Sequence, residues 1–122
     1  MAWKKYRKEN QVEDMWVSLG KEKEGYLTLR EGQSIEGYFE RLTESEKFDR
    51  PILNILNFDK SLRYLLFTPP QLTKIMEDLE QKYGTGIAVR LTYLGKREYK
   101  REDGEVITYH AFDVEYDEEN RL

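Results

Sequence analysis

The sequence predicts a single, mainly β domain in which five strands form a small curved barrel, with one α-helix between strands three and four. Two observations lead to this fold class: most apolar segments alternate with a period of two, whereas residues 68–83 repeat with helical spacing. At 122 residues and 39% hydrophobic content, the chain has the size of one domain with its own core. We expect an N-terminal extension at residues 1–28, the barrel at 29–117 and a short acidic and polar tail at 118–122.

The first barrel strand is expected at residues 34–42. Ile35, Gly37 and Phe39 share one face and alternate with polar residues, as in a strand that is buried on one side. Because a glycine permits a strand to bend where a barrel closes, Gly37 on the inner face indicates strong curvature. Within the N-terminal extension, residues 15–19 are a candidate strand that packs on the barrel.

Strands two and three are expected at residues 52–56 and 62–67, two short apolar segments. Asn57, Asp59 and Ser61 lie between them, and their side chains suit the backbone hydrogen bonds of a tight turn. We therefore expect the two segments to pair as a hairpin.

The helix at residues 68–83 is expected to begin with a capping box. Thr68 is the expected N-cap, Pro69 suits the first helical position, and Gln71 would complete the box. Gly84 is typical of the residue that ends a helix. The apolar residues at helical spacing are Leu72, Ile75, Met76 and Leu79.

Alternation resumes at residues 87–94 and 106–116, the expected strands four and five. The connection between them contains Asp103 and Gly104, a turn signal, so the pair forms a hairpin with a long basic tip. Five strands with a helix after the third are the arrangement of the OB-fold, a partly open five-stranded barrel. A generic α+β sheet is the main alternative.

The composition disfavours catalysis, metal binding and a membrane location. The chain has no cysteine and one histidine, His110, and its carboxylates lie in surface-like runs, so we expect no enzyme, no cofactor and no metal site. No run approaches the about 18 apolar residues of a membrane helix. Because the absence of cysteine fits a reducing compartment, we expect a cytoplasmic protein, in the host cytoplasm if the chain is viral.

Basic residues nevertheless gather around aromatic residues, although the formal net charge is -4. Phosphate contacts depend on local clusters of charge, and single-stranded nucleic acid needs cations for its phosphates and flat rings for its bases. An OB-fold presents such groups on strands two and three and in the one-two and four-five loops. The candidate nucleic-acid-binding residues are Lys96, Arg97, Tyr99, Lys100 and Arg101 in the four-five loop, Lys47, Phe48 and Arg50 in the one-two loop, and Arg63, Tyr64, Arg90 and Tyr109 on strands. The segment WKKYRK, residues 3–8, repeats the same combination.

Three segments carry a resemblance to a known family: GQSIEGYFE, TPPQLTKIMEDLEQKYGTGIAVRLTYLGK and GEVITYHAFDVEYDEE. In this order they resemble the OB-fold single-stranded-DNA-binding proteins of bacteriophages and related mobile elements, over residues 29–119. The resemblance implies sequence-tolerant binding and protection of single-stranded DNA during replication or recombination, alongside replication or recombination proteins as partners. The acidic end departs from the pattern because it is brief and finishes in Asn120, Arg121 and Leu122.

Two alternatives stay open at the level of sequence. The same barrel suits a protein-interaction module, such as a virion or replication adaptor, which would form a stable complex or a homo-oligomer. It also suits an RNA-binding OB domain, because base stacking and phosphate charge are common to DNA and RNA.

Overall fold

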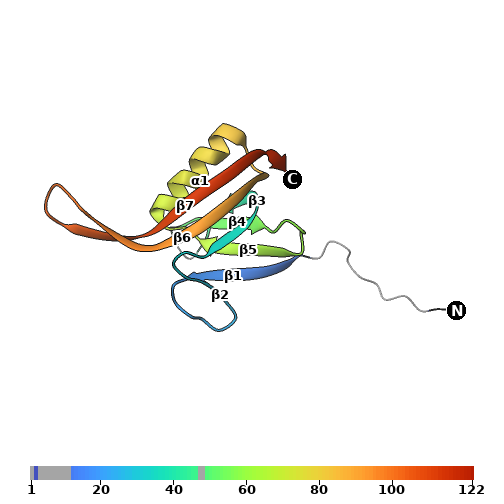
Figure 1. The fold of residues 1–122 in the computed structure, drawn as a ribbon, viewed down its shortest axis with the longest axis horizontal. Helices are drawn as coiled ribbons and strands as arrows, with labels where there is room; N and C mark the ends of the chain where they lie inside the picture. The colour runs from blue at the N-terminus through green and yellow to red at the C-terminus, as the bar shows by residue number, and fades with distance from the viewer. Residues whose placement is uncertain (1, 3–11, 47–48) are drawn as a thin grey trace.

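The computed structural model describes residues 2, 12–46 and 49–122, and over these ranges the chain is mainly β with one helix (Figure 1). The mainly β class with one helix is therefore confirmed, but the described residues form seven strands and not the predicted five. The elements are β1 (Glu13–Leu19), β2 (Leu27–Leu29), β3 (Ser34–Thr43), β4 (Ile52–Leu56), β5 (Leu62–Phe67), α1 (Pro70–Tyr83), β6 (Ile87–Lys100) and β7 (Val106–Arg121).

The two additional strands come from the predicted N-terminal extension. β1 pairs in parallel with β5, and β2 pairs in parallel with the other side of β1. Trp16 stacks on Phe67 with ring centroids 5.0 Å apart, and Val17 is buried, so side-chain packing accompanies the strand pairing. The sheet has the order β2-β1-β5-β4-β3-β6-β7 and curls into an open half-barrel with β2 and β7 at its edges (Figure 1).

β3 buries the face that its alternation predicts. Ile35, Gly37 and Phe39 are buried, and β3 lies between β4 and β6 in the sheet. At Gly37 an added Cβ would overlap the carbonyl of Leu56 on β4, so the backbones approach more closely than any side chain permits. A β-bulge follows between Phe39 and Arg41, which adds to the bend.

The apolar face of α1 covers the inner face of the curled sheet. Leu72, Met76 and Leu79 are buried on the helix, and Ile75 is packed against the core. Gly84 ends the helix as predicted, with its N–H donating to the Glu80 carbonyl. The sheet contributes Phe39, Leu53, Ile55, Leu66, Ile87, Leu91 and Phe112 to the same core.

The predicted capping box at the start of α1 is wrong. The helix begins at Pro70 with Pro69 as N-cap and without a side-chain cap. Thr68 Oγ1 instead donates to the Pro51 carbonyl, and Gln71 Oε1 accepts the N–H of Phe112 on β7 at 2.9 Å. Both side chains bond to segments that are distant in sequence, and such partners cannot be predicted from the residues around the start of the helix.

β6 and β7 are longer than their predicted counterparts. Lys100 pairs with Val106, so only residues 101–105 form the turn, and the predicted basic loop is a two-stranded ribbon that projects from the sheet (Figure 1). β7 continues to Arg121, which pairs with Ile87. The residues assigned to a terminal tail therefore belong largely to a strand.

The predicted hairpin between β4 and β5 is confirmed. Asn57 Oδ1 accepts the N–H groups of Ser61 and Leu62, and Asp59 Oδ1 accepts the N–H of Ser61.

Among the described helices, none is long and apolar enough to cross a membrane.

Candidate nucleic-acid interface

A cleft of about 860 Å³ lies between the first turn of α1 and the ribbon of β6 and β7. The connection after β3 contributes Arg50, and residues from both ribbon strands form the opposite wall. We call it the main cleft. It is lined by Arg50, Pro69, Pro70, Gln71, Lys74, Tyr99, Arg101, Ile107, Thr108, Tyr109 and His110.

The lining of the main cleft is cationic. Arg50, Lys74 and Arg101 belong to it, and no described carboxylate does. Arg101 approaches Glu105 at 3.7 Å, but both side chains are more than half exposed, so solvent screens this pair strongly. A local positive potential is thus present in a chain of negative net charge.

Two tyrosine rings stand on the ribbon wall of the main cleft. Tyr99 lies opposite Ile107 and two pairs from Tyr109, so the three side chains share a face of the ribbon. The Tyr99 and Tyr109 rings meet edge to face with centroids 5.8 Å apart. Tyr99 is 48% exposed, which leaves its ring open to a flat ligand.

His110 lines the main cleft and, of the lining residues on β7, is the one farthest from the ribbon tip. Its Nδ1 is 2.6 Å from the Tyr93 hydroxyl, and the two groups share a hydrogen bond. Burial lowers the pKa of His110, and the charges of Lys96 and Arg50 lower it further. The imidazole is therefore neutral at neutral pH.

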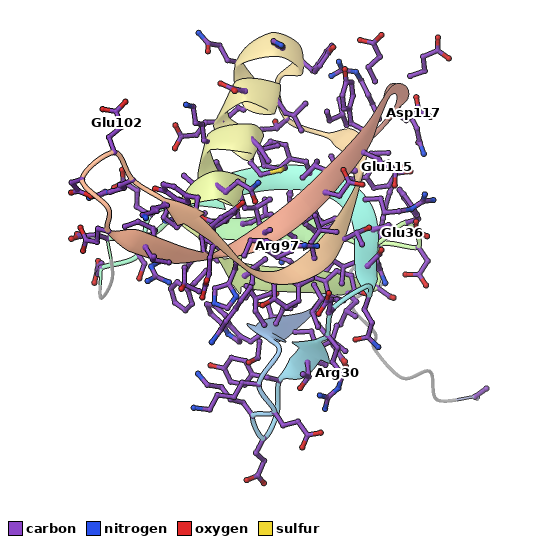
Figure 2. All side chains as sticks on the ribbon, turned by 60° about the vertical axis from the view of Figure 1, so that its left-hand side comes forward. Arg30, Glu36, Arg97, Glu102, Glu115 and Asp117 are labelled. Carbon is purple, nitrogen blue, oxygen red and sulfur yellow. The ribbon has the colours of Figure 1, made fainter. Side chains whose placement is uncertain are left out.

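The ribbon divides the predicted basic cluster. Because side chains alternate between the faces of a strand, Lys96 and Lys100 lie on the face opposite Tyr99. Arg97 pairs with Tyr109 on the Tyr99 face but is not part of the cleft lining. Figure 2 shows Arg97 on the ribbon, between the tip at Glu102 and the acidic group of Glu115 and Asp117.

Arg90 lies apart from the main cleft, on an acidic surface. Its guanidinium is 3.0 Å from Glu36 and 3.6 Å from Glu115, and these carboxylates raise its pKa. Figure 2 shows Glu36 and Glu115 on the same side of the sheet as Asp117. The charge of Arg90 is thus paired with carboxylates on the two neighbouring strands.

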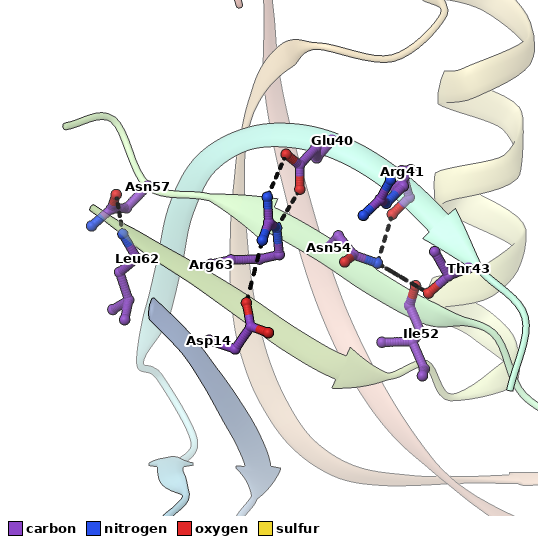
Figure 3. Close-up of polar contacts among 9 residues, drawn as sticks. All are labelled: Asp14, Glu40, Arg41, Thr43, Ile52, Asn54, Asn57, Leu62 and Arg63. Carbon is purple, nitrogen blue, oxygen red and sulfur yellow. Dashed lines mark hydrogen bonds and ion pairs between the residues drawn. The ribbon is translucent and has the colours of Figure 1, made fainter. Parts of the chain in front are cut away.

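Arg63 is also engaged by carboxylates. Its Nε is 2.5 Å from Glu40 Oε1, a second bond joins the same side chains, and Asp14 lies 3.3 Å away (Figure 3). Tyr64, the adjacent candidate, is partly buried and packs against the core. Neither residue lines the main cleft.

This network predicts a pH-dependent contribution to stability. The hydrogen bond and charge of Arg63 hold the pKa of Glu40 below its ordinary value of 4.5, so the ion pair stabilises the fold fully above that value and less as the pH falls. We expect Glu40→Gln to lower the free energy of unfolding by about 1 kcal/mol at pH 7, with the difference vanishing in acid. Urea titrations at several pH values measure it, and the exposed Glu98→Gln is the control; an equal difference at every pH would contradict this role.

Four of the sequence candidates meet in the main cleft: Arg50, Tyr99, Arg101 and Tyr109. Lys74 was not predicted, because on an amphipathic helix an exposed lysine reads as part of a solvated face. Lys47 and Phe48 lie outside the described residues, as does WKKYRK at residues 3–8.

In the described ranges, no three His, Cys, Asp or Glu side chains are placed to hold a metal ion.

Comparison with protein-family models, with curated proteins and with solved structures finds no match for this chain. The assignment of function therefore depends on the geometry of the site.

Proposed function

We propose that this protein is a non-enzymatic, sequence-tolerant single-stranded-DNA-binding module that protects DNA in replication or recombination. The observation that carries the proposal is the main cleft, where cations from three separate segments and two tyrosine rings line one space, with no carboxylate among the described lining residues. A single strand of nucleic acid requires this combination of phosphate contacts and stacking surfaces.

The two kinds of group have different roles in binding. The exposed Tyr99 ring offers an unstacked base a flat apolar surface, and the edge-to-face contact with Tyr109 holds that ring in place. Arg50 and Lys74 lie on the helix side of the cleft and Arg101 on the ribbon side, so phosphates on either side of the base meet a cation. Every base has a π-face, which makes the binding insensitive to sequence.

The order of the elements supports an OB-like module within the larger sheet. β3, β4 and β5 precede α1, and β6 and β7 follow it, as in the OB-fold. The main cleft collects residues from the β3–β4 connection and from the β6–β7 ribbon, which correspond to the one-two and four-five loops of that fold. We propose that β1 and β2 are an addition to this module, beside β5.

A titration tests the proposal directly. Oligothymidine, the equivalent RNA and a duplex are titrated against the protein at two salt concentrations, with intrinsic fluorescence as the signal. We expect single-stranded DNA to bind more tightly than duplex and the affinity to fall with salt, with a slope of about −2 for three phosphate contacts. Preference for RNA would favour the RNA-binding alternative, and no binding at low salt would reject the proposal.

Replacement of the exposed ring gives a sharper result. We expect Tyr99→Ala to weaken oligothymidine binding by about fivefold to 150-fold, the equivalent of about 1 to 3 kcal/mol for one stacked base. Tyr116→Ala is the matched control, because Tyr116 is also 48% exposed but lies on the acidic part of β7. Equal losses for the two variants would remove Tyr99 from the site.

One observation favours the protein-interaction alternative. The sheet is open, and its edge strands β2 and β7 offer backbone groups to which a partner strand can add. That function predicts a stable complex or homo-oligomer whose mass in light scattering persists on dilution, with no salt-sensitive affinity for nucleic acid.

A further inference from the structure

A second cleft, of about 360 Å³, is lined in part by Tyr93, whose hydroxyl shares a hydrogen bond with His110 of the main cleft. Its walls come from the end of β1, the turn after β2 and the middle of β6. We call it the N-terminal cleft. It is lined by Leu19, Gly20, Lys21, Arg30, Glu31, Tyr93, Gly95 and Lys96.

The two clefts share one boundary. Tyr93 lines the N-terminal cleft, His110 lines the main cleft, and their rings are 5.7 Å apart and joined by a hydrogen bond. Lys96 lines the N-terminal cleft and pairs across the ribbon with His110. Positive charge therefore continues from one cleft to the other across a single pair of side chains.

The charges of the N-terminal cleft favour an anion. Lys21 and Lys96 make no ion pair with any described residue, whereas Arg30 is 2.6 Å from the exposed Glu22. Glu31 is the one carboxylate among the described lining residues. Three cations against one carboxylate leave a net positive lining with two lysines available for phosphate.

Backbone geometry keeps this cleft open and fixed. Gly95 has a φ of 86°, and a Cβ there would lie 3.0 Å from the Glu31 carboxylate, so any other residue would be strained and would crowd the wall. The turn after β2 is attached to β6 by two hydrogen bonds, from Gly32 N–H to the Tyr93 carbonyl and from Tyr93 N–H to the Gln33 carbonyl. The walls are thus held by backbone contacts.

We infer that the N-terminal cleft is a second phosphate-binding subsite, which receives the continuation of the strand that occupies the main cleft. The inference rests on the proposed function and extends it to β1 and β2, the strands that lie outside the OB-like order. Lys21 and Lys96 contact the phosphates of this continuation, and Tyr93 with His110 separates the two subsites.

Two oligothymidines of different length test the inference, one of about 4 and one of about 16 nucleotides. The test variant is the full chain carrying Lys21→Glu and Lys96→Glu. The control variant carries Lys60→Glu and Lys82→Glu, because these two positions are exposed and line neither cleft. We expect the first variant to lose at least about tenfold more affinity for the longer oligonucleotide than for the shorter one, and its salt slope for the longer one to fall by about 1.4.

The outcomes separate the inference from the proposed function. If the wild-type chain binds neither oligonucleotide, the proposed function fails. If it binds both and the Lys21 and Lys96 variant loses affinity for the two lengths equally, or matches the control, the second subsite is wrong. Circular dichroism confirms that each variant retains the fold.

Discussion

Charge reversal of Arg50, Lys74 and Arg101 together is expected to weaken the binding of a short oligothymidine by about a hundredfold or more. These cations face the main cleft from three different elements, and each charge-assisted contact with a phosphate contributes about 1 kcal/mol or more. The salt dependence should fall with the affinity, because counterion release scales with the number of contacts. Fluorescence titrations at two salt concentrations measure both quantities.

A control variant with the same change in net charge shows whether the loss of affinity depends on where the reversed cations lie. Lys23, Lys60 and Lys82 are exposed and line neither cleft, so their reversal should reduce affinity only slightly through the overall field. Surface substitutions of this kind usually alter stability by at most about 0.5 kcal/mol each, so both triple variants should retain the fold. Equal weakening by the two triple variants would mean that the main cleft is not the binding site.

Substitution of Gly37 by valine is expected to lower the free energy of unfolding by about 3 kcal/mol or more. Valine favours strands, but at this position a Cβ would lie 2.9 Å from the Cγ2 of Ile55 and overlap the carbonyl of Leu56. Overpacking of this kind costs about 1 to 3 kcal/mol for small groups, and here rigid backbone forms part of the clash. Urea unfolding followed by circular dichroism gives the value.

Ser34→Thr on the same strand is the matched control. Ser34 is exposed, and threonine adds a β-branched side chain to the open face of β3 while its hydroxyl keeps the hydrogen bond with Thr92 Oγ1, so the change in unfolding free energy should stay within about 0.5 kcal/mol. If Gly37→Val unfolds like Ser34→Thr, then β3 and β4 can separate without loss, and the close approach at Gly37 does not shape the half-barrel.

The residues of each segment were sufficient to predict most of the elements. The buried face of β3, the turn between β4 and β5, and the end of α1 at Gly84 agree with their sequence patterns. Burial on one face is recorded in the residues of the segment itself, which is why periodicity identifies it. The same holds for the local combination of cations and rings around Tyr99.

The candidate site could be predicted only in part, because its members come from distant segments. Arg63 and Arg90 read as available cations, yet Glu40 and Glu36 on β3 engage them. A carboxylate on a neighbouring strand has no fixed spacing in sequence from the arginine that it binds. Lys74 was missed for the same reason, since only packing against β7 brings the start of α1 to the ribbon.

Three features of this protein could be predicted from its residues: a mainly β chain, one amphipathic helix and a local cluster of cations and rings. Only the folded sheet shows that β1 lies next to β5, that β6 and β7 continue as a ribbon, and that this ribbon separates Lys96 from Tyr99. Strands are joined by backbone hydrogen bonds, for which every residue offers a carbonyl and every residue except proline an N–H. Side-chain pattern therefore indicates which segments are strands, whereas their neighbours are selected by the packing of the whole sheet.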